Sequence, residues 1–351
     1  MKEKIDKAIL IWLLSGCFLI ATMVIIGGIT RLTHSGLSMV EWKLIMGSIP
    51  PLNEAEWMET FEKYKQTPEF KIKHSHFTLS EFKSIFFWEY FHRMIGRFIG
   101  IVFIVPFLYF LFNKRLSKPM FQKLLIVLAM GAFQGFLGWF MVKSGLVNRP
   151  DVSHYRLAAH LVTALILYCY TFWLALEVVF KRSMKLSVSY AGIQKLLVAF
   201  GIILFVQITY GAFVAGLKAG LFYPTFPKMG SSWIPMAVSF GFQDSGFMSI
   251  FENIATVQLI HRYVAKILFV LVIVLWIKSR KLELPNRLRF GINGLAITVM
   301  IQFLSGVFTL LLKIPVSLGV FHQFGAIVLL TFSIFSYYHL KVEPEKVLQN
   351  S

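Results

Sequence analysis

Cysteine and acidic side chains are both scarce in this sequence of 351 residues. The only two cysteines, Cys17 and Cys169, lie within apolar runs. A disulfide framework is therefore excluded, and so is a zinc site built on Cys-x-x-Cys pairs. Asp and Glu number 17 against 35 Lys and Arg, and charged residues make up only 15% of the chain.

The remaining composition is strongly apolar, with 57% hydrophobic residues and a mean hydropathy of +0.69. Soluble domains contain about 45–50% apolar residues, so we expect an all-α polytopic membrane protein. A net charge of +18 would suggest nucleic acid as the partner of a soluble chain. Here the basic residues cluster between apolar runs, as membrane orientation requires. We therefore expect a lipid bilayer as partner and no nucleic acid.

Eight apolar runs are long enough to cross a bilayer core of about 30 Å as helices. They lie near residues 8–29, 86–112, 121–142, 156–180, 193–217, 255–277, 290–312 and 316–340. The first run has no small-residue cleavage site, which favours a transmembrane helix over a signal peptide. Lys and Arg gather after the second, fourth and sixth runs, which predicts cytoplasmic termini. The lack of an Arg- and Ser-rich presequence favours a multi-pass protein of a bacterial plasma membrane.

The two halves of the chain resemble each other at an offset of 168 or 169 residues. The matched residues are His92 and His261, Arg93 and Arg262, Gln134 and Gln302, and Gly138 and Gly306. Four helices return the chain to its starting side, so both halves are expected to share one orientation, as parallel repeats. We therefore predict two four-helix bundles, residues 1–185 and 186–351. The first includes a long outer loop, 31–85, with an amphipathic segment near residues 57–64.

Four of the nine histidines lie within apolar runs: His92, His160, His261 and His322. Each is about 5–7 residues from the outer end of its helix, so all four share a depth of about 7–11 Å. One intramembrane histidine is usually a hydrogen-bonded packing residue, but two at one level in each half form a pattern. Facing histidines in a bundle suit bis-histidine ligation of a haem iron. We predict one pair in each half, with a polar network or another metal as the alternative.

The surroundings of these histidines fit a porphyrin better than zinc, because carboxylates are scarce at this depth. Five basic residues near the outer boundary can pair with haem propionates or snorkel to the interface: Arg93, Arg97, Arg156, Arg262 and Lys266. Five glycines allow close approach of a flat macrocycle or of a neighbouring helix: Gly96, Gly100, Gly131, Gly135 and Gly138. The other histidines are expected at the surface: His34, His74, His76, His154 and His339.

One acidic residue distinguishes the two halves. Glu89 precedes His92 by three residues and so lies about one helical turn away, whereas the position before His261 is Gln258. A charged carboxylate inside a membrane costs on the order of 2.5 kcal/mol or more. Glu89 is therefore expected either to take part in chemistry or to form an ion pair with Arg93 or Arg97. The N-terminal half is the candidate reaction site.

Several segments resemble the heme A synthase family. They are Gly28–Met39, Trp88–Arg97, Gln134–Gly145, Asp151–Arg156 with His160, Asn253–Arg262, and His322 with Gln323. The resemblance spans nearly the whole chain. Some members carry a cysteine pair in the first outer loop that is absent here, so the chain resembles the cysteine-free branch of alphaproteobacterial and mitochondrial type.

The resemblance implies an eight-helix membrane enzyme that oxidises the ring D methyl group of heme O to a formyl group, giving heme A for terminal oxidases. It implies that His92 and His160 serve the substrate haem, with Glu89 beside them. It further implies that His261 and His322 hold a haem b in the C-terminal half, with both haem sites toward the outer face. Glu89 would then move a proton or stabilise positive charge at the methyl carbon.

Two other classes of protein remain as alternatives. A di-haem electron-transfer cytochrome needs the four histidines but no reacting methyl group, and a haem transporter needs one exchangeable haem and no chemical product. Candidate partners beyond heme O are its synthase, assembly factors of the terminal oxidase and a second copy of the chain.

Overall fold

The computed structural model describes residues 6–40, 49–145, 151–180 and 190–340. Within these ranges the chain is helical and contains no β-strand. The long helices are α1 (Lys7–Leu32), α3 (Leu79–Phe112), α4 (Lys118–Gly145), α5 (His154–Val179), α6 (Ala191–Gly216), α9 (Ile254–Arg280), α10 (Asn286–Leu311) and α11 (Val316–His339). The short ones are α2 (Glu54–Lys65), α7 (Met236–Ser245) and α8 (Ser249–Glu252).

The eight long helices are each long and apolar enough to cross a membrane, which confirms the predicted spans. The largest difference is at the start of α3, which begins at Leu79 rather than near residue 86. A capping box explains the early start, because Thr78 and Glu81 bond each other's backbone N–H groups. The first turns of α3, residues 79–85, are too polar for the sequence pattern to include them in a membrane span.

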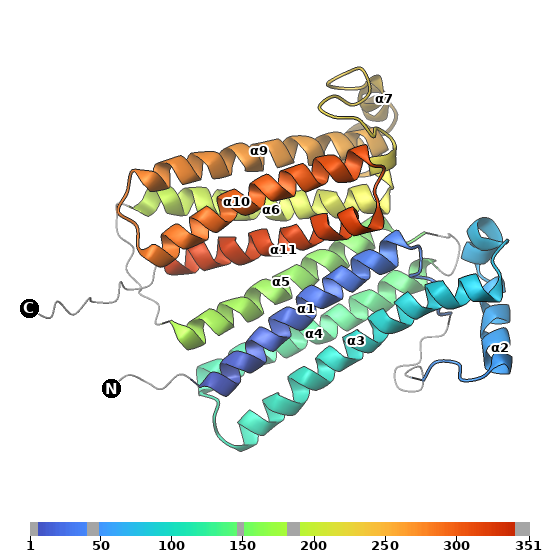
Figure 1. Ribbon diagram of the computed structural model, residues 1–351, viewed down its shortest axis with the longest axis horizontal. Coiled ribbons are helices and arrows are strands. Elements are labelled where there is room, and N and C mark those ends of the chain that lie inside the picture. The colour runs from blue at the N-terminus through green and yellow to red at the C-terminus, as the bar shows by residue number, and fades with distance from the viewer. Residues whose placement is uncertain (1–5, 41–48, 146–150, 181–189, 341–351) are drawn as a thin grey trace, which may run out of the picture.

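The long helices run roughly side by side in two groups (Figure 1). α1, α3, α4 and α5 form the N-terminal half, and α6, α9, α10 and α11 form the C-terminal half. α1 and α5 also pack against α11, and α5 packs against α6, so the halves share a wide contact. α1 begins and α11 ends at the same end of the bundle, whereas α2 and α7 lie at the opposite end, called here the loop end.

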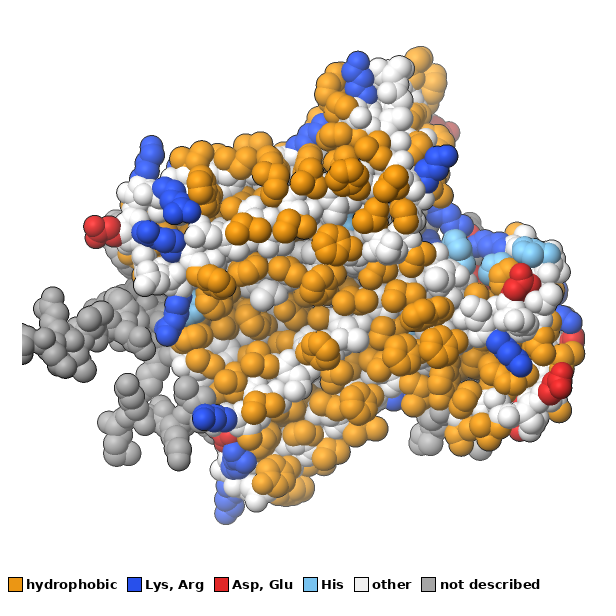
Figure 2. Space-filling view, viewed as in Figure 1, with side chains coloured by type: hydrophobic (Ala, Val, Ile, Leu, Met, Phe, Trp, Pro, Cys, Tyr) orange, Lys and Arg blue, Asp and Glu red, His pale blue; other side chains and the backbone are white. Residues whose placement is uncertain are grey.

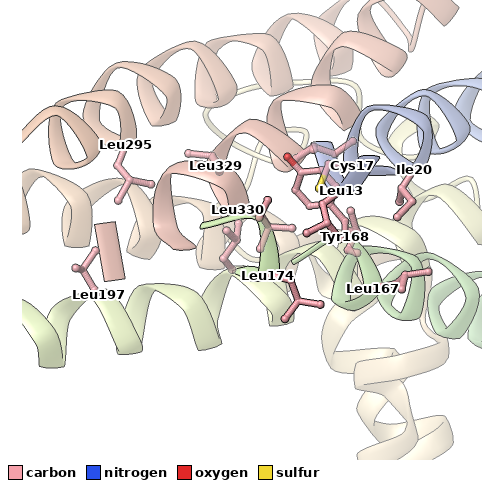
Figure 3. Close-up of a cluster of buried hydrophobic side chains, with 14 of the residues drawn as sticks. Leu13, Cys17, Ile20, Leu167, Tyr168, Leu174, Leu197, Leu295, Leu329 and Leu330 are labelled. Carbon is pink, nitrogen blue, oxygen red and sulfur yellow. The ribbon is translucent and has the colours of Figure 1, made fainter. Parts of the chain in front are cut away.

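Buried apolar side chains join the two halves (Figure 3). Leu13 and Cys17 of α1 pack with Tyr168 of α5 and Leu330 of α11 in one continuous cluster. The Tyr168 hydroxyl lies 2.7 Å from Oγ1 of Thr331, so the cluster also carries a hydrogen bond between the halves. In a bilayer such dense packing and interhelical hydrogen bonds hold helices together.

The surface of the bundle is mostly apolar along its length, and lysine and arginine side chains gather toward its two ends (Figure 2). This distribution fits a multi-pass membrane protein with polar ends on either side of the bilayer.

The segment expected to be amphipathic near residues 57–64 is helix α2. Its buried side chains, Phe61 and Tyr64, pack against Phe82 in the first turns of α3, with ring centroids 5.1 and 5.0 Å apart. The apolar face of α2 therefore covers the start of α3 at the loop end.

Candidate functional site

Each of the four membrane histidines lies against a glycine of a neighbouring helix. A Cβ atom added to Gly27, Gly138 or Gly211 would lie 3.2–3.3 Å from Cε1 of His92, His160 or His261 respectively. The same atom on Gly306 would lie 2.8 Å from Cε1 of His322. The glycines thus make room for imidazole rings between closely packed helices. Of the five glycines named from the sequence, only Gly138 has this role; Gly27, Gly211 and Gly306 were missed.

The four histidines divide between the two halves. His92 of α3 and His160 of α5 belong to the N-terminal half, and His261 of α9 and His322 of α11 belong to the C-terminal half. That the two histidines of each half share one haem stays a prediction from the sequence.

Glutamine and serine side chains orient the histidines of α5 and α11. The Gln134 amide lies 3.1 Å from Nδ1 of His160 and donates to its carbonyl at 2.9 Å. Gln302 donates to the carbonyl of His322 at 2.7 Å, and the Ser305 hydroxyl lies 2.9 Å from its Nδ1. The Ser305 hydroxyl donates to the Gln302 carbonyl and can accept from Nδ1–H of His322, which leaves Nε2 its lone pair, as in metal-ligating histidines. The Gln134 amide group, in contrast, donates to Nδ1 of His160.

The histidines of α3 and α9 are less well partnered. Nδ1 of both His92 and His261 is buried and forms no hydrogen bond to any described residue. The Gln207 amide lies 3.3 Å from Nε2 of His261, whereas the matching position in the N-terminal half, four residues before Gly27, is Met23. Both Nδ1 atoms lie on the side of the facing glycine, 3.7 Å from a Cβ on Gly27 and 3.9 Å from a Cβ on Gly211.

The donor set fits a haem and does not fit zinc. Among the described residues, no group of three or more His, Cys, Asp or Glu lies close enough to hold a metal ion. A structural or catalytic zinc ion takes three or four protein ligands, but a haem iron takes only two axial ones. Each half supplies two partly buried histidines on different helices, each with room made by a glycine, which is the number that a haem requires.

Glu89 is buried and held by several groups at the loop end of the N-terminal pair. Its side chain is 4% exposed and pairs with Arg93 at 2.6 Å. Its other oxygen accepts hydrogen bonds from the Ser38 hydroxyl at 2.7 Å and from the Met39 N–H at 2.8 Å. Arg93 also donates to the Met39 carbonyl at 3.1 Å. The ion pair between Glu89 and Arg93, one of the two roles predicted for Glu89, is present. Through Ser38 and Met39, Glu89 also joins the first loop to α3. Further along α3, Nη1 of Arg97 lies 3.7 Å from Sδ of Met94.

The matching positions of the C-terminal half bind a loop without any carboxylate. Gln258 donates to the Tyr223 carbonyl at 3.1 Å. Arg262 donates to the carbonyls of Tyr223, Thr225 and Lys228, at 2.5, 2.7 and 3.3 Å. Its Nε atom is buried and forms no hydrogen bond to a described residue.

The two pairs are joined through one dipeptide of α1. Gly27 faces His92, and the next residue, Gly28, faces Gln323, the neighbour of His322. A Cβ on Gly28 would lie 2.3 Å from Oε1 of Gln323, whose amide donates to the Val24 carbonyl at 3.0 Å. The backbone of α1 thus contacts both sites within two residues.

Two of the histidines expected at the surface are instead buried. His74 is 8% exposed and His339 is 3% exposed. The expectation failed for His74 because the first loop folds back on itself: the Tyr64 hydroxyl lies 2.7 Å from Nδ1 of His74 and 3.3 Å from Glu69. His339 is covered because it packs against the ring of Phe180, with centroids 4.7 Å apart.

Burial raises the pKa of Glu69 to about 7.

Comparison with known proteins gives consistent relatives. Residues 10–334 match the family model COX15-CtaA, described as cytochrome oxidase assembly protein. The chain is 49% identical to a heme A synthase of Flavobacterium psychrophilum over 93% of its own length and 96% of that protein. It is 46% identical to a heme A synthase of Flavobacterium johnsoniae, covering 96% of this chain and 99% of the relative. For a heme A synthase of Nitrosospira multiformis the identity is 42%, covering 97% and 95% respectively.

Proposed function

The chain belongs to the COX15-CtaA family of cytochrome oxidase assembly proteins, and from this membership we propose that it carries out the reaction of a heme A synthase. Its substrate is heme O, whose ring D methyl group it oxidises to a formyl group. The enzyme is a multi-pass membrane oxidoreductase, and we place it in the bacterial plasma membrane with the loop end outward.

One observation supports this reaction above the others: the two histidine pairs have similar surroundings, but only one has a buried carboxylate beside it. A di-haem cytochrome gives no reason for Glu89 at one site and Gln258 at the other. A haem transporter gives no reason for two histidine pairs. We therefore assign the N-terminal pair to the substrate and the C-terminal pair to a haem b.

In the N-terminal half, His92 and His160 would hold the iron of heme O from opposite faces. Gly27 and Gly138 leave space for the two rings, and the Gln134 amide orients the ring of His160. These two histidines would hold the substrate between α3 and α5, and contacts at the edge of the macrocycle would be needed to turn the ring D methyl group toward Glu89.

In the C-terminal half, His261 and His322 would hold haem b, which supplies one-electron transfer when bound. Gln302 and Ser305 fix the ring of His322. Buried Nε of Arg262 is a donor suited to a propionate, and Arg93 and Arg97 would supply positive charge at the corresponding level of the other site.

Conversion of a methyl to a formyl group removes four electrons in two successive two-electron steps, through an alcohol and a hydrate that loses water. Each two-electron step breaks a C–H bond, releases a proton and forms a C–O bond, so an oxygen donor and an electron acceptor from outside the chain are required, and positive charge develops on the carbon as its electrons leave. The carboxylate of Glu89 lies one helical turn from His92 and is fixed by Arg93, Ser38 and Met39. Because these partners hold its negative charge in place, we assign Glu89 the stabilisation of positive charge near the methyl carbon.

The deciding experiment is extraction of haems from protein purified after expression beside a source of heme O, followed by chromatography with mass detection. Heme B together with heme A, or with a hydroxylated heme O, would support the proposal. Heme B alone despite available heme O would contradict it and favour an electron-transfer cytochrome. His92→Ala and His322→Ala assign the products to halves: the first should remove heme O and heme A, and the second heme B.

A further inference from the structure

Two short helices at the loop end expose opposite kinds of surface. Helix α2 covers the start of α3 with its apolar face and exposes charged side chains, among them Glu56, Glu59 and Glu62. Helix α7 buries Val238 and Gly241 but exposes large apolar side chains on its other faces. The outer face of α2 is therefore suited to water, whereas that of α7 is not.

The exposed apolar surface extends over the chain on both sides of α7. Between residues 219 and 253 only Lys228, Asp244 and Glu252 carry a charge. Exposed apolar surface of this extent marks a site of contact with a partner or a membrane. Seven side chains of this segment are 51–72% exposed: Leu221, Phe222, Trp233, Ile234 and Met236 before or at the start of α7, and Phe240 and Phe247 within or after it.

This segment lies beside the bundle as well as at its end. Helix α7 packs on α9 and projects to the side of the bundle at the loop end (Figure 1). Before α7, Arg262 of α9 holds the loop through the carbonyls of Thr225 and Lys228. Further along α9, the ammonium group of Lys266 lies 5.2 Å from the ring centroid of Trp233. The loop therefore follows the flank of α9 from Arg262 to Lys266.

The position of Lys266 on α9 places Trp233 at the depth of lipid. Helix α9 has 27 residues and is about 40 Å long, about 10 Å more than the apolar core of a bilayer. Lys266 lies about 18 Å from the start of α9, so its backbone is within the core even if all the excess is at the loop end. It also stands about 140° round the helix from His261, which favours snorkelling over contact with a haem propionate.

The flank of α9 next to Trp233 is itself lipid-facing. The ammonium group of Lys266 lies 4.6 Å from the ring centroid of Tyr263, on the same flank. Through Trp233, the apolar surface around α7 is therefore continuous with the outer surface of a membrane span. A shallow, apolar groove follows this flank, lined by Tyr263, Lys266, Ile267, Val270, Leu271 and Val274.

We propose that residues 221–248, with α7 at their centre, form an interfacial anchor that inserts its exposed apolar side chains into the leaflet at the loop end. The partner of this surface is phospholipid. Its acyl chains contact the apolar side chains, and its phosphates match the positive charges of Lys228 and Lys266. The segment is then held from two sides, by Arg262 of the bundle and by lipid. Helix α2, with its charged outer face, stays in water.

The test is fluorescence quenching of the purified full chain in nanodiscs of phosphatidylcholine and phosphatidylglycerol. Phe240→Cys and Phe247→Cys each carry a bimane label, and both side chains are exposed, so the core is not disturbed. Lipids brominated on their acyl chains should quench both labels. Aqueous iodide should quench them about threefold or more weakly than a label in water, because an interfacial face lies about 5–10 Å within the headgroup boundary. Labelled wild type, with only its native cysteines, gives the background.

The matched control is Glu59→Cys, on the charged face of α2 at the same end of the bundle. Its label should be quenched by iodide and not by brominated lipid. Iodide quenching at Phe240→Cys and Phe247→Cys equal to that at Glu59→Cys would overturn the anchor, since the segment would then face water. Shielding from both quenchers would also overturn it, because a second copy of the chain or another protein would then cover the surface.

Discussion

The N-terminal and C-terminal histidine sites share their ring-facing glycines, the glutamine on α4 and α10, and an arginine that donates to loop carbonyls, yet they differ in other residues around that frame. The first has a buried carboxylate, and a thioether where the second has an amide. The second has a serine on Nδ1 of one histidine and an aromatic contact between Phe269 and Phe303. Under the proposed function, the common frame would hold a haem in each half, and the carboxylate beside the first site would decide which haem is oxidised.

Replacing the carboxylate should give the largest separation of the two sites. Glu89→Gln keeps the size of the side chain but removes its charge, so heme A formation should fall about 10²–10³-fold, as expected for loss of one stabilising group at a reacting centre. The haem b content should not change. The measurement is the ratio of heme A and its hydroxylated precursor to heme B in extracts.

The matched control is Gln258→Ala at the corresponding position of the other half, which should retain heme A formation. A Glu89→Gln protein within a few-fold of wild-type output would contradict the assigned role. Retention of bound heme O by the variant distinguishes lost chemistry from a collapsed site, because a purely structural Glu89 would lose the substrate as well.

Removing the partner of one histidine should weaken only its own site. Ser305→Ala deletes the hydroxyl at Nδ1 of His322, and loss of such a partner typically lowers metal affinity about 10–100-fold. The haem b occupancy and reduction potential should change while the N-terminal site binds heme O normally. Leu137→Ala, at the matching position of α4, is the control; an equal loss of haem b in that variant would refute the specific effect of the hydroxyl.

A single methyl group should affect the two sites unequally. Gly306→Ala places a Cβ 2.8 Å from the His322 ring, whereas Gly138→Ala places it 3.2 Å from the His160 ring. Overpacking costs about 1–3 kcal/mol, and we expect the upper part of that range only for Gly306→Ala. Low-temperature electron paramagnetic resonance of the low-spin haems reports displacement of the imidazole ring. Thermal unfolding reports the loss of stability. A greater disturbance from Gly138→Ala would reverse the ranking.

The smallest expected difference concerns the loops that cover the sites. Burial raises the pKa of Glu69 to about 7, above the ordinary value of a glutamate in an unfolded chain. The folded loop therefore favours the protonated form, and the resulting stabilisation is complete below the ordinary glutamate pKa and is lost as the pH rises through about 7. Lys73 opposes this shift and Glu89 adds to it.

Hydrogen exchange in residues 54–77 should thus be faster at about pH 8 than at about pH 6, after correction for intrinsic exchange. Glu69→Gln should remove most of that difference. The segment 223–228, held through backbone carbonyls by Arg262, should show little change over the same range. A loop of residues 54–77 with no pH dependence in wild type would show that Glu69 does not govern its stability.

The sequence predicts the fold well because apolar run length and charge between runs are local properties. All eight spans were found this way, and the start of α3 moved most, since its capping turns are polar. The histidine pairs follow from shared depth. The facing glycines Gly27, Gly211 and Gly306 were missed because nothing local shows which helix an imidazole ring touches.

The contacts of Gly27 and Gly28 predict how the protein would behave if its chain were split into two fragments. A chain cut between residues 180 and 190 would yield one piece with the first histidine pair and one with the second. The C-terminal piece would then lose the α1 backbone that accepts from Gln323 beside His322. The C-terminal piece therefore lacks part of its binding site until it meets the N-terminal piece, so a split version would act as a complementation pair in which the restored spectrum of the C-terminal haem reports that the fragments have associated.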